Sequence, residues 1–206
     1  MTEAKWFAST DPAALGAAVM RRKRASARVL RLYVAAFWSW QSHRLKTARD
    51  RAQLRRRAAL VEEWAETGVE PPQANAERIF VGLGASAKEA FRSTVRAPKQ
   101  WKDGNGPATK HAVRLLHEVF GNPFTTRAAR KTAPRRGWMF SPSWRTDTAV
   151  ALARQMYDSR DFGAMPILAD ALQDAGCDND DILDHCRGPG EHVRGCWVVD
   201  LVLQKA

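Results

Sequence analysis

The sequence predicts an all-α protein, with a long basic helix near the N-terminus and a C-terminal bundle of short helices. Three observations support this fold class. Apolar residues recur at helical spacing in most segments, no stretch alternates as a strand would, and no internal repeat is present. With 206 residues, 45% of them hydrophobic, and eight tryptophans, the chain can bury a core in one domain or two small ones.

The long basic helix is expected over residues 21–57, which carry thirteen lysines and arginines against one acid, Asp50. This stretch contains no Gly or Pro that would break a helix. Tyr33, Phe37 and Trp40 recur on one helical face. As a single helix it would be about 55 Å long at ~1.5 Å per residue.

Helix start and stop signals frame this basic segment. Thr2 is expected to cap a short first helix, and Pro12 behind Asp11 begins a second one that can run into the basic segment. Past residue 57 the apolar stripe continues as far as Gly68, where the helix is expected to end. Two prolines at 71–72 prevent the helix from continuing beyond this point.

The middle of the chain is harder to assign. Residues 82–87 (GLGASA) loosely fit the G-x-G-x-x-A pattern of a dinucleotide-binding loop, but no βαβ pattern surrounds them, which favours a plain helix N-terminus. Residues 98–109 are rich in Gly and Pro and predict a loop. An amphipathic helix is expected over 110–120, ending at Gly121.

Four further helices are expected after residue 141, over 146–157, 165–176, 180–186 and 193–203. Pro166 lies at a first helical turn, and Asn179 is expected to cap the third of these helices.

Charge divides the chain unevenly. Residues 1–140 hold 27 Lys and Arg against 11 Asp and Glu, a net +16, whereas residues 141–206 hold 6 against 11, a net −5, which together give the formal +11. This asymmetry predicts three parts: N-terminal helices with the basic segment (1–70), a helical part with basic loops (71–140) and an acidic helical bundle (141–206). All three can also form one compact domain.

Targeting signals are not apparent. The first residues include Glu3 and Asp11 and resemble no signal peptide, and no apolar run approaches the ~20 residues that span a bilayer. Three cysteines without framework spacing are typical of a reducing compartment. We therefore expect a cytoplasmic protein that is not a membrane protein.

Both ends of the chain resemble a family of uncharacterised bacterial proteins. The opening MTEAKWFASTDP resembles the family's M-T-E-A-x-W-x-A-x-T-D-P start. FGNPF at 120–124, WRT at 144–146, MPILADAL at 165–172, HCRGPG at 185–190 and HVRGCWVVD at 192–200 resemble its C-terminal signature. Residues 33–38 replace a Cys-rich stretch of the family, and the loop after Phe124 is longer and more basic. The resemblance implies a helical fold and transfers no catalytic residue, because the family has no established activity.

Cysteine and histidine gather near the C-terminus at Cys177, His185, Cys186, His192 and Cys196. Sulfur and imidazole are suitable zinc ligands, and Cys177, His185, His192 and Cys196 are the candidates. The spacing lacks a C-x2-C pair, and Cys186 directly follows His185, which makes joint ligation awkward. Packed thiols and hydrogen-bonded histidines are the favoured interpretation, so no metal or other cofactor is predicted.

No catalytic motif is present. Carboxylates near the histidines could support metal-assisted hydrolysis but lie in no H-E-x-x-H pattern, and solvated helix faces account for them: Asp170, Asp174, Asp181, Asp184 and Glu191. A G-x-S-x-G elbow is also absent. Arg187 and Arg194 flank a Gly-Pro-Gly turn, where an ion-pair network with Asp184 and Asp200 is favoured over a recognition site.

The basic segment instead suggests binding to a polyanion. Lys and Arg neutralise phosphates without reading bases. Phe37, Trp38 and Trp40 could stack on unpaired bases, but aromatic residues at helical spacing are more often core. We expect Tyr33, Phe37 and Trp40 inside and leave Trp38 open. An anionic membrane surface is disfavoured, because no clean exposed apolar strip is predicted.

We therefore expect a non-enzymatic nucleic-acid-binding accessory protein, for example a small subunit of a ribonucleoprotein or DNA-processing complex, with RNA and DNA both open. The alternative is an interaction module for an acidic protein, and a more distant one is a zinc-dependent enzyme. The residues expected at phosphates are Arg21, Arg22, Lys23, Arg24, Arg28, Arg31, Arg44, Lys46, Arg49, Arg51, Arg55, Arg56, Arg57, Arg127, Arg130, Lys131, Arg135 and Arg136.

Overall fold

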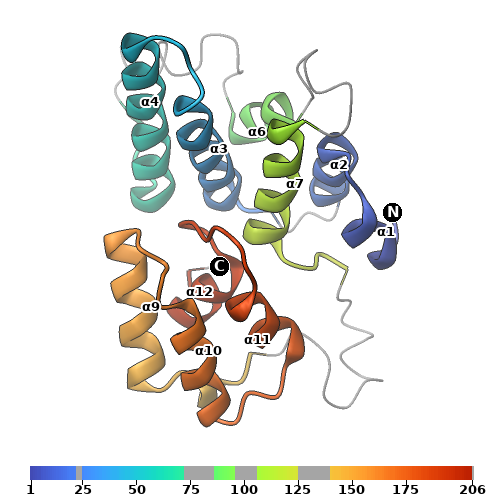
Figure 1. Cartoon of the computed structure of the whole chain (residues 1–206), viewed down its shortest axis with the longest axis vertical. Coiled ribbons are helices and arrows are strands. Elements are labelled where there is room, and N and C mark those ends of the chain that lie inside the picture. Colours follow the sequence, from blue (N-terminus) through green and yellow to red (C-terminus); the bar gives the residue numbers. More distant parts are fainter. Residues whose placement is uncertain (22–24, 72–85, 96–105, 125–139, 206) are drawn as a thin grey trace. The chain divides into compact units, whose positions relative to one another are not determined.

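The fold is helical throughout the part of the chain that the computed structural model describes, residues 1–21, 25–71, 86–95, 106–124 and 140–205. No strand occurs in these ranges, so the predicted all-α class is confirmed. The chain divides into two compact units, Met1–Pro123 and Phe124–Ala206 (Figure 1). No helix in the described ranges is both long and apolar enough to span a membrane.

The helices of each unit follow the chain in order. Unit 1 contains α1 (Glu3–Ala8), α2 (Pro12–Arg21), α3 (Ala27–Ser42), α4 (Ala48–Thr67), α6 (Ala87–Val95) and α7 (Pro107–Phe120). Unit 2 contains the 3-10 turn η2 (Pro142–Trp144), α9 (Asp147–Ser159), α10 (Met165–Asp174), α11 (Asp180–Arg187) and α12 (Trp197–Leu203).

Helix α3 is the centre of unit 1. It packs against α4 on one side and against α6 and α7 on the other, while α2 packs on α6 and α7 (Figure 1). A helix surrounded in this way must be apolar around most of its circumference. The buried side chains of α3 accordingly point in several directions: Leu30, Leu32, Tyr33, Val34, Ala35, Phe37 and Trp38.

The prediction of a single long helix over residues 21–57 is wrong. Helix α3 ends at Ser42 and α4 begins at Ala48, so the basic segment folds back on itself as a helical hairpin. Thr47 caps α4 by accepting a hydrogen bond from the backbone N–H of Asp50 (3.0 Å). The Arg51 guanidinium donates to the carbonyls of Leu45 (2.8 Å) and Lys46 (3.0 Å), which closes the turn.

The N-terminal helix signals are confirmed. The backbone N–H of Lys5 donates to Thr2 at the start of α1, and Pro12 opens α2. Trp6 is fully buried and its indole N–H donates to the Gly121 carbonyl (3.0 Å), which fixes α1 at the C-terminal end of α7. Gly121 ends α7 with a positive φ of 53°, a conformation in which glycine carries no Cβ penalty.

Unit 2 has its own core, to which each of its described α-helices contributes. Its most buried side chains include Met156 from α9, Leu168 from α10, Ile182 from α11 and Val198 from α12. The predicted cap Asn179 accepts from Ile182 N–H (3.2 Å). Thr146, which was expected as the first residue of a helix, is in fact the cap of α9 and accepts from Ala149 N–H (3.2 Å). The last helix was predicted from residue 193 but begins at Trp197, because residues 193–196 form a turn instead.

Replacing the cap between α3 and α4 tests the hairpin. Thr47→Ala removes the only side-chain acceptor at the start of α4 and should lower the free energy of unfolding by about 1 kcal/mol. Urea unfolding followed by circular dichroism measures this change. Thr10→Ala, an exposed threonine outside any helix, is the matched control and should change stability by less than ~0.5 kcal/mol. Equal effects of the two substitutions would contradict the capping role.

Candidate functional site

Of the basic segment at residues 21–57, the outer face of α4 carries the largest group of exposed arginines among the described residues. Arg49, Arg55 and Arg56 are exposed on it, and exposed Lys46 lies just before the helix. These four residues form what we call the α4 basic face. The opposite side of the helix faces the core through residues such as Ala58 and Val61. Arg57 is half-buried between the two sides.

The arginines of the α4 basic face lack acidic partners within the described residues, where no ion pair to Arg49, Arg55 or Arg56 is found. None of the three has an acid three or four positions away, the spacing at which helical side chains meet. The next acid along the helix after Arg56 is Glu62, about 9 Å further along the axis. This face therefore carries positive charge that the hairpin itself does not neutralise.

Three other arginines expected at phosphates instead hold the hairpin together. Arg28 pairs with Glu66 across α3 and α4 (3.1 Å), and Arg51 closes the turn as described above. Arg31 lies over the ring of Trp64, with its guanidinium carbon 3.8 Å from the ring centroid. Burial lowers the pKa of Arg31, while the charge of Glu70 opposes that shift. Sequence reasoning placed these three side chains with the exposed ones because their charge alone does not show which face they occupy.

The aromatic residues of α3 are not available as stacking surfaces. Tyr33 and Phe37 are buried as expected, and Trp38, which the sequence left open, is only 6% exposed. Trp40 is half-buried rather than fully inside. Its ring is stacked with that of His111 at 4.2 Å between centroids, and the Arg44 guanidinium carbon lies 4.5 Å from its centroid. The His111 ring and the Arg44 guanidinium therefore both lie against the indole of Trp40.

Several predicted residues lie outside the described part of the chain. The described ranges do include Arg21, which is exposed at the end of α2. The dinucleotide-like loop falls mostly in the gap at 72–85, and its last residue, Ala87, begins α6, with the N–H of Glu89 donating to Ser86. The cations that fall outside the described ranges are Arg22, Lys23, Arg24, Arg127, Arg130, Lys131, Arg135 and Arg136.

The ring stack beside Trp40 predicts a pH dependence of stability. Burial, with the charges of Arg114 and Arg44, lowers the pKa of His111 from 6.5 to about 4. Between these two values the unfolded chain binds a proton at this position that the folded chain does not. The contribution of neutral His111 to the free energy of unfolding is therefore fully present above pH 6.5 and is lost as the pH falls toward 4.

The test is His111→Phe, which keeps a ring beside Trp40 but cannot be protonated. The thermal midpoint of the parent should fall more between pH 7 and pH 5 than that of the variant. His43→Phe is the control, because His43 is exposed at the end of α3, and this substitution should leave the parent's pH dependence in place. If the thermal midpoints of the parent and of His111→Phe fell equally between pH 7 and pH 5, His111 would not be the source of the pH dependence.

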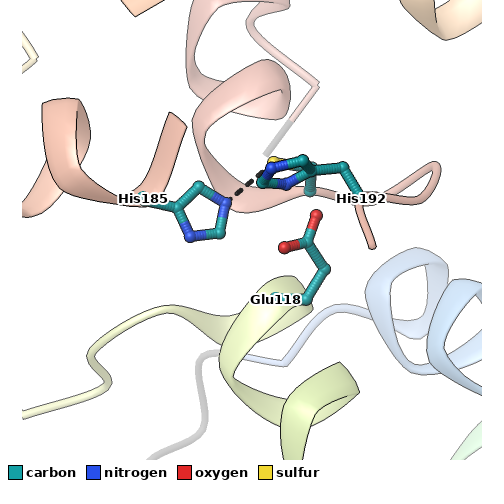
Figure 2. A group of neighbouring side chains, drawn as sticks. Glu118, His185 and His192 are labelled. Carbon is teal, nitrogen blue, oxygen red and sulfur yellow. Dashed lines mark hydrogen bonds between the residues drawn. The ribbon is translucent and has the colours of Figure 1, made fainter. Parts of the chain in front are cut away.

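A second group of side chains that could bind a ligand lies in unit 2. The Nε2 of His185 is 3.2 Å from the Sγ of Cys196, the contact marked by the dashed line in Figure 2. The His185 and His192 rings are 5.0 Å apart at 70°. The atoms of these three residues that can bind a metal lie within 4.8 Å of one another. Glu118, also labelled in Figure 2, is a residue of α7 in unit 1.

The other two cysteines do not belong to this cluster. Cys177 is buried before the start of α11, whereas His185 lies in the last turn of that eight-residue helix. Burial raises the pKa of the Cys177 thiol, which favours its protonated form. Cys186 is buried in the core of unit 2. Of the four zinc candidates from the sequence, the structure therefore brings together His185, His192 and Cys196 and leaves Cys177 apart.

Two arginines anchor the turn that carries His192. Arg187, before the turn, donates to Asp170 (2.8 Å) and Gln173 (2.6 Å) on α10. Arg194, after it, donates to the backbone carbonyls of Tyr157 (2.7 Å) and Asp158 (3.3 Å) at the end of α9. The partner of Arg187 is thus Asp170 on another helix rather than Asp184, which the sequence had suggested.

The candidate hydrolytic carboxylates do not form a catalytic arrangement among the described residues. All five are exposed, at Asp170, Asp174, Asp181, Asp184 and Glu191. Asp170 is paired with Arg187. Four of these carboxylates lie on the exposed faces of α10 and α11, and Glu191 lies in the turn after α11. The Asp170–Arg187 pair is a surface ion pair.

The chain was compared with protein-family models, with curated proteins and with solved structures. None of these comparisons gave a match. The residues of the two units themselves provide the basis for a functional proposal.

Proposed function

We propose that the protein binds nucleic acid through the α4 basic face and contacts its phosphate backbone. The observation that supports this proposal most directly is the group of exposed arginines, Arg49, Arg55 and Arg56, without acidic partners in the described residues. Uncompensated positive charge on a surface attracts a polyanion and releases its condensed counterions on binding.

The residue type and spacing suit phosphate. A guanidinium presents paired N–H donors that fit a phosphate group, and it remains charged at any physiological pH. Arg49 and Arg56 are seven residues apart and share one face, about 10 Å along the helix axis. Phosphates of one strand of B-DNA follow at ~3.4 Å along the duplex axis, so several fall within that length. One helix face can therefore contact more than one phosphate.

The proposed mode of binding is independent of base sequence. The aromatic rings that could stack on bases are buried or, for Trp40, in contact with His111 and Arg44. Contacts to phosphates position a protein on nucleic acid but carry no sequence information. In this proposal the protein acts in the cytoplasm as a non-enzymatic accessory subunit of a larger complex, and the ligand is an RNA or DNA backbone.

The experiment is a binding titration of the full chain with random single-stranded RNA, single-stranded DNA and duplex DNA at several salt concentrations. The logarithm of the affinity should fall linearly with the logarithm of salt concentration. The triple variant Arg49→Gln/Arg55→Gln/Arg56→Gln should bind more weakly. If each arginine contacts one phosphate, its slope should be shallower by about 2 for single strands and about 3 for duplex DNA.

A matched variant controls for net charge. Arg92→Gln/Arg114→Gln/Arg154→Gln removes the same number of charges from exposed arginines on α6, α7 and α9. It should keep the slope within about one unit of the parent's. Weak binding without salt dependence, or equal losses in the two triple variants, would contradict the proposal. Capture of an acidic protein by the α4 basic face, with no nucleic-acid binding, would favour the alternative partner instead.

A further inference from the structure

We propose that His185, His192 and Cys196 bind a divalent transition-metal ion of the zinc type. The three side chains come from separate parts of unit 2: the last turn of α11, the turn that follows it and the residue before α12. Their ligand atoms nevertheless converge within 4.8 Å of one another. This inference depends on unit 2 alone and is independent of the α4 basic face.

The donor set suits this class of ion. Two imidazoles and one thiolate are ligands that zinc accepts, whereas calcium and magnesium prefer oxygen. In a tetrahedral zinc site with nitrogen and sulfur ligands, ligand atoms lie about 3.3–3.6 Å apart, as follows from bonds of about 2.0–2.1 Å to nitrogen and about 2.3 Å to sulfur. The separation of His185 Nε2 and Cys196 Sγ, 3.2 Å, is already close to that value. The half-buried His192 ring would complete the set through a small side-chain movement.

The backbone that carries these ligands is held in place. Arg187 anchors the end of α11 to α10, and Arg194 anchors the far end of the turn to α9. Gly195, directly before Cys196, has a φ of 92°, a conformation that side chains other than glycine rarely adopt. Through this turn the Cys196 side chain enters the core, where it is 0% exposed. Ligands held by such contacts lose little further freedom when they bind an ion.

The three ligands leave one tetrahedral position for water or another small ligand. Sites with three protein ligands and an open position differ from closed structural sites, which use four. His185 and His192 are half-buried, so an ion can reach them from solvent. When the ion binds, the Cys196 thiol must lose its proton to solvent, because the thiolate is the form that ligates.

Cobalt is the probe for this site, because Co²⁺ in a tetrahedral sulfur–nitrogen site has visible ligand-field bands and a sulfur-to-metal charge-transfer band. The reduced full chain should bind one Co²⁺ with both signatures, and Zn²⁺ should abolish them by displacement. His192→Gln should weaken Co²⁺ binding at least tenfold. Cys196→Ser should remove the charge-transfer band.

Cys177→Ser is the matched control, because it removes another buried thiol of unit 2 that lies outside the cluster, and its spectrum should equal the parent's. Circular dichroism verifies that each variant is folded. Since Cys196 is in the core, His192→Gln remains a test even if Cys196→Ser unfolds. Absence of a tetrahedral cobalt spectrum in the parent, or its retention at full affinity in His192→Gln, would overturn the proposal.

Discussion

The burial of α3 on several sides determines what the rest of unit 1 can do. Because α4, α6 and α7 all pack against it, Tyr33, Phe37 and Trp38 become core. Its two arginines contact Glu66 and Trp64 on α4. Three arginines of the same basic segment, Arg49, Arg55 and Arg56, are left facing solvent on the outer side of α4. The short turn before Thr47 causes this difference between the arginines of α3 and those of α4, since it folds one basic segment into a buried helix and a more exposed one.

Unit 2 uses its arginines in the opposite way. Arg187 and Arg194 are not presented to a partner but tie a Gly-Pro-Gly turn to the two neighbouring helices. Their hydrogen bonds fix the positions of His192 and of the residue before α12, where the thiol of Cys196 lies. Positive charge thus has a binding role in the proposal for α4 and a positioning role here, and the difference lies in whether acceptors of the same unit are within reach.

Helix signals in the sequence predicted much of the fold, because they act locally: Thr2, Pro12 and Asn179 all begin helices as expected. The turn between α3 and α4 was missed, since it contains no Gly or Pro and the Thr47 cap lies inside a continuous basic run. Tertiary packing decided the rest. Sequence spacing could not distinguish Arg31 from Arg56, because Arg31 contacts Trp64 on another helix. It could not distinguish Cys177 from Cys196 either, because the contact of Cys196 with His185 depends on how the chain folds between them.

In our proposal the exposed arginines of α4 contact a polyanion, while those of the hairpin interface remain bonded within the fold. Nuclear magnetic resonance of the arginine side-chain Nε–Hε groups, with and without a short single-stranded oligonucleotide, observes both groups of arginines in one experiment. We expect the signals of Arg49, Arg55 and Arg56 to shift with added oligonucleotide, whereas those of Arg28 and Arg31 stay unchanged. Unchanged signals from all three α4 arginines at saturating oligonucleotide would contradict the proposal.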